Sequence, residues 1–577
     1  MLKNNFTLGQ LLLLTLLLLG CDQPHEIPPP VEPLQFMTPQ SADGENIAIV
    51  PEILAKTVIA TQTAETALSV TQIETVAAPP SVTPTIEAEA QVSDDRLAVS
   101  VRHGVPNAWR TALAAVPAVE LVESGASVEL VVNEGTPVTE AVYALVVPLY
   151  SFVETASWEM VQARWQADAP QLAGSTETLT AISQILGQSG AGVLVIDDAA
   201  ALAERVWAAD DVWGIVPLGD LSAELKTLPI DGQSPLKRTT DLASYPLALP
   251  IGAVGDPEAV AKLQTVMPSV ALEWQPDKLT DVAMTGVTAL VRATAYTMEE
   301  NGILWPGEDV RGVLNSADIA HLSNEVAFVD DCPTPRLVGG TRFCSNPRYF
   351  ALVQDLGIDV MELTGNHVND YGAEAFAASI KLYQASGMKY FGGGLNSADA
   401  QTAAIFEHNG NRIVFLGCNP VGPSYALAGD SSAGSRPCDD AIKRQIREKS
   451  AEGATVIVTL QYYEHYFYEP TYQQQLDFRS YIDAGASIVS GSQGHHVQGL
   501  DLYSGGFIHY GLGNLFFDQM DMLGTRQTMI DTYTIYKGKL AGVTFTTGLI
   551  ERYARPRLMS AEERRQLFET LFNVSTR

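Results

Sequence analysis

The stretch Met361–Gly372, MELTGNHVNDYG, is the most informative part of the sequence. An interrupted apolar run, Val353 to Leu363, leads into a Gly-Asn-His turn, and an Asp and a Gly follow. The glycine before the turn lets the backbone bend sharply enough for Asn366 and His367 to face one point. An amide oxygen and an imidazole delivered from the end of one strand are suited to hold a divalent metal ion. An ordinary polar loop is the alternative, so the neighbouring sequence has to decide.

Polar clusters of the same kind end three further apolar segments. SNE (323–325) follows ADIAHL, QYYEH (461–465) follows ATVIVTL, and GSQGHHVQG (491–499) follows ASIVS. Seven of the nine histidines lie in the same part of the chain. Ligands of open α/β sheets collect at the carboxyl ends of strands, so the fourfold repeat predicts one site within residues 280–540.

Residues 279–540 resemble the CapA-type family of poly-γ-glutamate capsule synthesis proteins, which have a calcineurin-like metallophosphatase fold. The similarity rests on eight segments in the same order, of which YIDAGASIVSGSQGHHVQGL and FIHYGLGNLFFDQ are the most distinctive. The resemblance implies a four-layer α/β sandwich over residues 279–545. The other matching segments are LTDVAMTGVTALVRA, SNEV, TGNHVNDYG, FGGGLNSADA, RIVFLGCNP and ATVIVTLQYYEHY.

The resemblance also implies roles for individual residues. The positions that match the family's metal ligands are Glu325, Asn366, His367 and His495. The expected catalytic acid–base groups are His465 and His496. The residues expected to contact substrate are Asn324, Asp370, Gln498 and Asn514.

The sequence departs from the family at several of these motifs. Val287 replaces the usual metal-binding Asp, Gln461 stands at a usual His, and His465 stands at a usual Glu. Ser492 interrupts the Gly-His-His-Pro-His motif, of which only the last His remains. A two-metal site needs a bridging carboxylate and several imidazoles. The sequence therefore predicts at most one divalent ion, Mn²⁺, Zn²⁺ or Mg²⁺.

Two functions stay open. One is a metal-dependent hydrolase in the synthesis or processing of a capsule or cell-envelope polymer of the poly-γ-glutamate kind. The other is a catalytically decayed binding or assembly module for an envelope polymer or a small anion. The metal content of the purified protein distinguishes them.

Composition narrows the possible partners. The chain has 577 residues, enough for more than one domain, and 46% of them are hydrophobic. Its formal net charge is −32. Nucleic-acid binding depends on Lys and Arg neutralising phosphates, so this charge excludes nucleic acid as an expected partner.

The amino terminus predicts the location. Lys3 precedes an apolar run, Leu11 to Leu19, and then Leu-Leu-Gly-Cys ends at Cys21. This arrangement is typical of a secretory signal and resembles the bacterial lipobox. Residues 1–21 are then a lipoprotein signal, and the lipidated Cys21 anchors the protein on the extracytoplasmic face of the cell membrane. A plain signal peptide with an incidental Cys is the alternative.

Four further cysteines allow three disulfide connectivities. An even number in an exported chain favours disulfides over free thiols. We expect the local pairs Cys332–Cys344 and Cys418–Cys438, each closing a loop that contains Pro and Gly. A Cys metal site is disfavoured because the four show no C-x-x-C spacing.

Three other segments complete the predicted organisation. Residues 22–95, rich in Pro, Thr and Ala, are expected to be a disordered tether. Residues 96–275 alternate apolar segments expected to be buried strands (VYALVVPLY, AGVLVIDD, VWGIVPL) with helical stretches, and resemble type 2 periplasmic binding proteins in a smaller α/β domain. Residues 546–577 form a C-terminal extension, whose helix should begin after Ser560 and carry an apolar stripe for docking.

Overall fold

The computed structural model describes residues 96–209, 211–267 and 274–577. The described residues belong to one compact unit. The predicted signal peptide, the lipidation at Cys21 and the tether 22–95 lie outside the described residues. Among the residues that are described, no helix has the length and apolar character needed to cross a bilayer.

The amino-terminal part of this unit is built on a nine-stranded sheet of order β2-β1-β3-β9-β4-β7-β5-β6, with β8 paired to β4. The strands are β1 (Leu97–Val101), β2 (Val119–Leu121), β3 (Val128–Val132), β4 (Thr136–Pro148), β5 (Leu172–Gly174), β6 (Val193–Val195), β7 (Trp213–Pro217), β8 (Leu225–Thr227) and β9 (Ala248–Gly255). Its helices are α1 (Asn107–Ala114), α2 (Trp158–Trp165), α3 (Thr176–Leu186), α4 (Ala199–Trp207) and α5 (Pro257–Val266).

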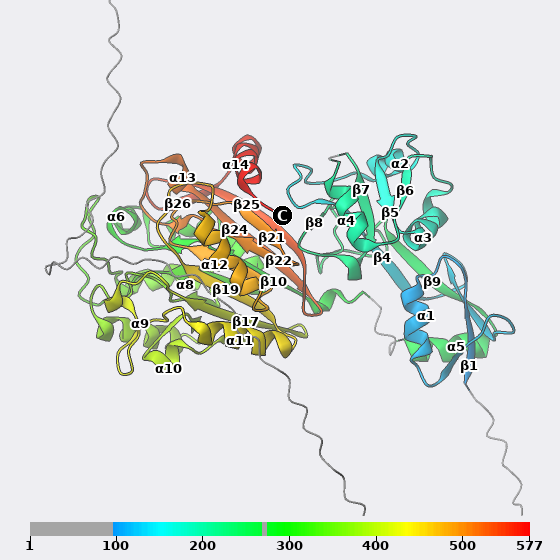
Figure 1. Cartoon of the computed structure of the whole chain (residues 1–577), viewed down its shortest axis with the longest axis horizontal. Helices are drawn as coiled ribbons and strands as arrows, with labels where there is room; N and C mark the ends of the chain where they lie inside the picture. The colour runs from blue at the N-terminus through cyan, green and yellow to red at the C-terminus, as the bar shows by residue number, and fades with distance from the viewer. Residues whose placement is uncertain (1–95, 210, 268–273) are drawn as a thin grey trace, which may run out of the picture. The chain divides into compact units, whose positions relative to one another are not determined.

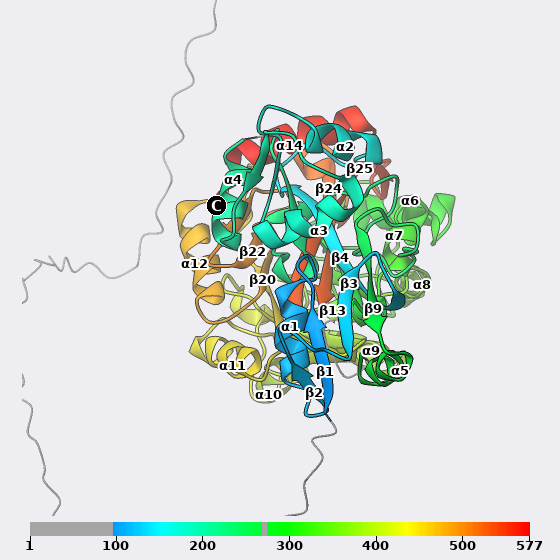
Figure 2. The same ribbon diagram turned by 90° about the vertical axis from the view of Figure 1, so that its right-hand side faces the viewer.

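Strand β4 joins two halves of this sheet. Residues 136–142 pair with β9, and residues 143–148 pair with β7 and β8. Helices α1 and α5 pack on the half with β1, β2, β3 and β9, whereas α3 and α4 pack on the other half (Figures 1 and 2). The predicted buried strands are confirmed for β4 and β7. The prediction is wrong for β6, because this strand ends the sheet and Val195 is 60% exposed.

Two further sheets make up the carboxyl-terminal part. The first has the order β14-β13-β12-β10-β24-β25-β26, with β11 and β23 attached, and the second has the order β16-β17-β19-β20-β22-β21. The first sheet contains β10 (Leu279–Thr285), β11 (Val287–Thr288), β12 (Ile319–Asn324), β13 (Val360–Glu362), β14 (Lys389–Phe391), β23 (Asn514–Phe516), β24 (Gln527–Tyr536), β25 (Lys539–Glu551) and β26 (Arg555–Leu558). The second contains β16 (Ala404–His408), β17 (Asn411–Cys418), β19 (Thr455–Gln461), β20 (Ile488–Ser492), β21 (Leu500–Tyr503) and β22 (Gly506–His509). A small ribbon pairs β15 (Gly393–Gly394) with β18 (Gly434–Ser435).

The helices of this part are α6 (Arg292–Asn301), α7 (Arg311–Ser316), α8 (Phe350–Asp355), α9 (Ala373–Ala385), α10 (Ser397–Ala400), α11 (Asp440–Ala451), α12 (Tyr472–Ile482), α13 (Leu523–Arg526) and α14 (Ala561–Val574). Helices α6 to α9 pack on the first sheet and α11 and α12 on the second, whereas α14 packs against the apolar layer between the sheets. Leu322 of β12 packs with Phe376 of α9, and Val456 of β19 packs with α11 and α12. Met284 and Phe415 belong to the apolar layer between the two sheets. These layers form the predicted four-layer α/β sandwich, so the fold class is confirmed.

Two local predictions are also confirmed. Cys332 pairs with Cys344, and Cys418 pairs with Cys438. Helix α14 begins after Ser560, whose side chain accepts the N–H of Glu563 while the Glu563 carboxylate accepts the N–H of Ser560. This reciprocal cap satisfies two backbone donors at the helix start.

Candidate functional site

The predicted polar clusters do follow buried parallel strands. Glu325 comes directly after β12, Asn366 and His367 follow β13, and His495 follows β20. Strands β12 and β13 are parallel neighbours in one sheet, and β19 and β20 are parallel neighbours in the other. Their carboxyl ends deliver these side chains to one region of the molecule.

Glu325 is the most unusual residue of this region. Its side chain is 1% exposed, and neither carboxylate oxygen has a hydrogen-bond partner. Burial raises the pKa of Glu325, although the nearby His495 and His367 oppose that shift. A buried carboxylate without a partner is costly in its ionised form, so it either keeps a proton or binds a cation.

Gly365 lets the next loop approach this carboxylate closely. A Cβ at Gly365 would lie 2.4 Å from the Cα of Glu325. Gly365 is not among the glycines with positive φ, so the backbone conformation does not require a glycine here. We expected a sharp turn to be the reason for a glycine at position 365. That reason is wrong, because the position requires glycine for its lack of a side chain.

His367 is held in place by Asp370 and Phe343. Its Nδ1 lies 2.8 Å from Oδ2 of Asp370, and its ring lies 4.3 Å from the ring of Phe343. Burial alone would lower the pKa of His367, but the bond with Asp370 and the charge of Glu325 raise it overall. A carboxylate on Nδ1 fixes the ring so that Nε2 is the nitrogen left for a ligand.

His495 is held in a similar way from the other sheet. Its Nδ1 lies 2.7 Å from Oδ1 of Asn514, and its ring stacks on Phe517 at 5.1 Å. The backbone of His495 has a φ of +50°, and that of Gln493 has a φ of +75°. Such values are uncommon for residues with a Cβ and cluster at functional loops.

Asn366 belongs to a buried network of amides. Its Oδ1 accepts a hydrogen bond from Nε2 of Gln461 at 3.1 Å, and Gln461 also bonds to Gln493. The hydroxyl of Ser492 donates to Oε1 of Gln461 at 2.9 Å. The residues that replace family histidines thus bond to Asn366 and to one another, and the Asn366 oxygen accepts one of these bonds.

A second buried carboxylate lies next to this network. Glu362 contacts His321 at 3.1 Å and accepts a hydrogen bond from Ser492 at 3.2 Å. Burial would raise the pKa of Glu362, but the hydrogen bond with His321, supported by Thr364, lowers it below its usual value. Glu362 therefore has the partners that Glu325 lacks.

Val287 has no ligand to offer to this region. Its side chain is 1% exposed, and its backbone N–H donates to the Gly513 carbonyl at 3.0 Å. In register, Val287 lies opposite Ser323 on one side and Asn514 on the other. An isopropyl group at this position has no lone pair to donate to an ion.

The structure does not bring every predicted residue into this cluster. Asn324 turns toward the helix layer, where it donates to the Val326 carbonyl at 2.8 Å and the Tyr383 hydroxyl at 3.0 Å. Gln498 accepts from Gln474 at 3.0 Å and donates to the Phe467 carbonyl, so it ties a loop together.

The two histidines expected to be catalytic form their hydrogen bonds with backbone carbonyls. Nε2 of His465 is 2.9 Å from the Glu469 carbonyl, and its ring packs on the exposed Phe467. His496 is 4% exposed, bonds to the Val497 carbonyl and packs edge-on against Tyr468. Burial lowers the pKa of His496.

Glu464 is a residue that the sequence analysis missed. Its carboxylate accepts from Gln493 at 3.3 Å and from the Tyr466 hydroxyl at 2.9 Å. The Glu464 charge raises the pKa of both Glu325 and His367, although burial and other partners influence these two pKa values more strongly. The segment QYYEH already contained this carboxylate. Glu464 stands one position before His465, which was expected to occupy the family's Glu position.

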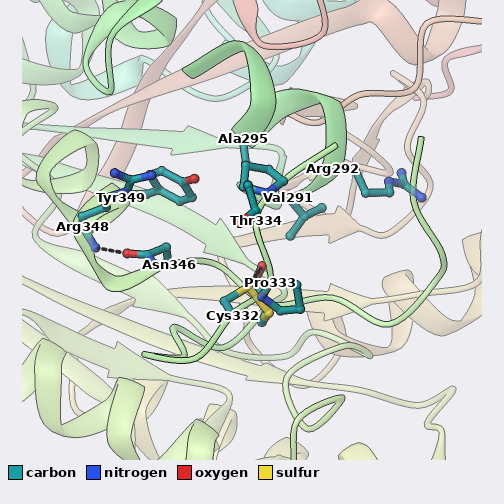
Figure 3. A pocket seen from close by; sticks show the side chains of 11 residues that line it. Val291, Arg292, Ala295, Cys332, Pro333, Thr334, Asn346, Arg348 and Tyr349 are labelled. Atoms are coloured by element: carbon teal, nitrogen blue, oxygen red, sulfur yellow. Dashed lines mark hydrogen bonds between the residues drawn. A yellow bond between two sulfur atoms is a disulfide. The ribbon is translucent and has the colours of Figure 1, made fainter. Parts of the chain in front are cut away.

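Arg292 borders the site beside a small cavity. Its guanidinium forms a two-pronged bond with Asp518 and lies over the rings of Phe343 and Phe517, the same rings that contact His367 and His495. The cavity has a volume of about 110 Å³ and lies between the start of α6 and the Cys332–Cys344 disulfide (Figure 3). The other guanidinium that lines it, that of Arg348, pairs with Glu299.

The described side chains do not form a ready-made metal site. Within the ranges that the structure describes, no group of three or more His, Cys, Asp or Glu side chains lies close enough to hold an ion without moving. Glu325 nevertheless has two unpartnered oxygens, and His367 and His495 are each oriented by a second residue. Oxygen and imidazole donors of this kind suit Zn²⁺ or Mn²⁺.

The fold is a layered α/β domain, and ionisable side chains follow the ends of its parallel strands. Residues 281–519 match the model of the family described as "Bacterial capsule synthesis protein PGA_cap". This part of the chain is similar to that family, and the resemblance to CapA-type capsule synthesis proteins seen in the sequence is confirmed for it.

The curated relatives cover only part of the chain. The capsule biosynthesis protein CapA of Bacillus anthracis is 32% identical over 172 residues, which is 29% of this chain and 42% of that protein. The PGA biosynthesis protein CapA of Bacillus subtilis (strain 168) is 26% identical over 195 residues, which is 33% of this chain and 51% of that protein. The chain thus spans about half the length of these relatives.

Solved structures show weaker similarity. A 5'-nucleotidase precursor from Thermus thermophilus has 13% identity and a TM-score of 0.29, over 50% of this chain and 58% of that one. An ABC-type phosphate transport receptor from Vibrio cholerae has 10% identity and a TM-score of 0.26, over 30% of this chain and 93% of that one. The periplasmic-binding character of residues 96–275 stays a prediction.

Proposed function

We propose that this protein acts in the synthesis or processing of a capsule or cell-envelope polymer, as a hydrolase that uses one divalent metal ion. The CapA proteins of two Bacillus species, named for capsule and PGA biosynthesis, support the polymer class. The buried, unpartnered carboxylate of Glu325 supports the ion, and it is the observation that carries the proposal.

Three residues would hold the ion: Glu325, His367 and His495. Their donor atoms come from both sheets, so the ion would also join the two halves of the sandwich at this edge. When bound, a divalent ion polarises a phosphoryl or carbonyl oxygen and lowers the pKa of a coordinated water. Asn366 would be a further ligand, because its oxygen accepts one hydrogen bond from Gln461 and keeps a second lone pair.

The chain's own residues supply orientation and proton transfer. Asp370 and Asn514 fix the two imidazole rings through their Nδ1 atoms. Glu464 is the carboxylate that accepts or donates a proton, in place of His465 and His496. It is exposed to solvent and is held toward the cluster by Gln493.

We also propose the location and partners that the sequence predicts. Lipidation at Cys21 would anchor the protein to the extracytoplasmic face of the cell membrane. An envelope polymer or the capsule synthesis machinery would then be its partner. The lipobox-like sequence before Cys21 supports this part of the proposal.

Metal analysis of the purified full chain tests the proposal. We expect about one equivalent of Mn²⁺ or Zn²⁺ after loading and dialysis, and close to none in His367→Ala. His408→Ala is the control, because His408 lies on β16, bonds to Thr280 and should leave the content unchanged. Full metal retention by His367→Ala would contradict the proposed site.

The binding or assembly module remains the second candidate. The closed amide network of Gln461, Gln493 and Asn366 favours it, because these neutral groups fill positions where the family has ligands. A purified chain that takes up no ion, yet binds the polymer, would support this alternative.

A further inference from the structure

The segment that connects β19 to α12 is rich in aromatic residues. Residues 462–472, YYEHYFYEPTY, contain six of them, which are Tyr462, Tyr463, Tyr466, Phe467, Tyr468 and Tyr472. Three of the six are buried or half-buried, and the other three are mostly exposed. The two sets have different surroundings and serve different purposes.

The buried and half-buried rings fix the segment to the domain. The Tyr462 hydroxyl donates to Oδ2 of Asp477 on α12 at 2.6 Å. The Tyr468 hydroxyl donates to Oε1 of Gln527 at the start of β24 at 2.7 Å. The segment is therefore tied to α12 at its beginning and to β24 further along, so its outer side chains stand on a backbone that is held in place.

The other three rings are directed to the solvent. Tyr463 is 57% exposed, Phe467 is 66% exposed and Tyr472 is 75% exposed. Phe467 lies within a turn that is closed by the contact of 2.9 Å between Nε2 of His465 and the Glu469 carbonyl. Single exposed apolar side chains are ordinary, but a group of them on one short segment marks an interaction surface.

This exposed group adjoins the proposed site. Glu464 lies between Tyr463 and Phe467 in the chain, and its carboxylate accepts the hydroxyl of Tyr466 at 2.9 Å. The ring of Tyr466 is parallel to that of His495, with the two centroids 6.4 Å apart. A ligand that rests on the exposed rings would therefore reach the group proposed for proton transfer.

A second segment extends the same exposed area. The Tyr466 hydroxyl accepts a hydrogen bond from Nε2 of Gln519 at 3.3 Å, which brings the chain after β23 beside the loop. This chain carries Met522 and Leu523, which are 43% and 58% exposed. We call these five exposed side chains the aromatic surface: Tyr463, Phe467, Tyr472, Met522 and Leu523.

The segments that form the aromatic surface carry acidic side chains and no basic ones. Residues 450–478 and 480–525 contain no Lys or Arg, whereas Glu464, Glu469 and Asp521 lie among or beside the exposed side chains in the chain. An anionic ligand would meet these carboxylates without a counter-charge from the same segments. The hydroxyl groups of a neutral ligand can instead donate hydrogen bonds to them.

We propose that the aromatic surface binds a neutral glycan, which places a polysaccharide segment of the envelope polymer next to Glu464. The apolar C–H face of a sugar ring packs on an exposed aromatic ring, and the hydroxyls at its edge donate to a carboxylate. The inference rests on the proposed function for what happens at Glu464, but glycan binding itself requires no metal ion. The two proposals can therefore fail separately.

Calorimetric titration of the purified full chain with cellohexaose and with chitohexaose, two neutral six-sugar chains, tests the proposal. We expect the wild type to bind at least one of them, equally well after metal removal and after loading with Mn²⁺. The affinity should stay constant between about 0.05 and about 0.5 M NaCl, because a neutral ligand is not screened by salt. Metal content measured on the same samples tests the proposed function independently.

The aromatic side chains are tested one at a time. Phe467→Ala and Tyr463→Ala should each weaken glycan binding roughly 5- to 10-fold, because one stacking contact is lost. Phe467→Trp should retain binding, since an indole also offers a flat face. Phe152→Ala is the matched control, because Phe152 is 51% exposed but lies beside Phe572 of α14.

Three results would overturn the proposal. The first is a folded wild type that binds neither glycan, and the second is equal glycan binding by Phe467→Ala, Tyr463→Ala and Phe152→Ala. The third is binding of poly-γ-glutamate or oligolysine that exceeds binding of both glycans and is lost in Phe467→Ala, which would assign the surface to a charged partner. Thermal unfolding of each variant confirms that it is folded, as expected for changes at exposed side chains.

Discussion

Oδ2 of Asp370 lies 2.8 Å from Nδ1 of His367 and accepts the backbone N–H of Phe343 at 2.7 Å. One carboxylate oxygen therefore fixes both the imidazole and the chain that carries the aromatic ring beside it. This arrangement gives Asp370 a positioning role, in contrast to the substrate contact expected from the sequence.

Asp370→Asn should weaken metal binding about 10- to 100-fold, because the amide no longer holds the His367 ring as a carboxylate does. Titration of the full chain with Zn²⁺ in a competing chelator measures the change. Asp399→Asn is a suitable control, since Asp399 accepts bonds from Leu395 and Tyr390 outside the cluster. An unaltered affinity in Asp370→Asn would remove Asp370 from the site.

Metal affinity should rise with pH. The pKa values of Glu325 and His367 are raised above their ordinary values of 4.5 and 6.5, so both hold protons that an ion has to displace. A raised folded-state pKa stabilises the ion-free protein at low pH, and this contribution is lost as pH rises through that pKa. The increase in melting temperature on adding Mn²⁺ should therefore grow as pH rises beyond 6.5, and a constant increase would contradict this linkage.

Val287→Asp should raise the metal stoichiometry above one, because it restores a carboxylate at the position where the resembled family has its metal-binding Asp. Without metal, the buried carboxylate is expected to lower stability by several kcal/mol. Added Mn²⁺ should recover much of that loss and increase hydrolysis of a generic phosphodiester. Elemental analysis and thermal unfolding measure both effects. Val287→Asn is the control, since it adds a polar group of the same size without the charge.

Glu464→Gln should reduce hydrolysis of a phosphodiester about 10²- to 10⁴-fold while the metal content stays the same. Loss of proton transfer affects kcat, whereas ion binding depends on other residues. Glu469→Gln, on the same loop, is the comparison variant and should behave like wild type. If His465→Ala lost activity and Glu464→Gln kept it, the proton-transfer role would return to the histidine.

Cys21→Ser should release the protein from membranes. Each buried CH₂ of an acyl chain contributes about 0.8 kcal/mol to membrane binding, and the substitution removes the attachment point. Fractionation followed by a high-salt wash measures the distribution of the protein. A mutant that remains in the washed membrane fraction would show that another part of the chain provides the anchor.

The strand ends of the carboxyl-terminal domain could be predicted because hydrophobic runs and the polar groups after them are local features. The direction in which the Asn324 side chain points could also have been predicted from the sequence. Ala320 and Leu322 face the helix layer, so the two-residue period of β12 assigns Asn324 to that layer as well. The family resemblance assigned Asn324 to the substrate site, whereas the alternation along β12 assigns it to the helix layer.

Other features of the site could not be derived from the sequence. Glu464 and His465 lie in an irregular loop, where no period tells which of two adjacent side chains turns inward. The bond between Gln461 and Asn366 joins residues 95 positions apart and depends on how the two sheets pack.

The Cys332–Cys344 disulfide connects oxidation of the newly made chain to the structure around His367. Phe343, which supports His367 and supplies the N–H bound by Asp370, is the residue next to Cys344. A newly made chain with reduced thiols lacks the covalent tie that holds this residue beside the imidazole. If the proposed ion is bound, its loading would follow formation of this disulfide and would take place in an oxidising compartment.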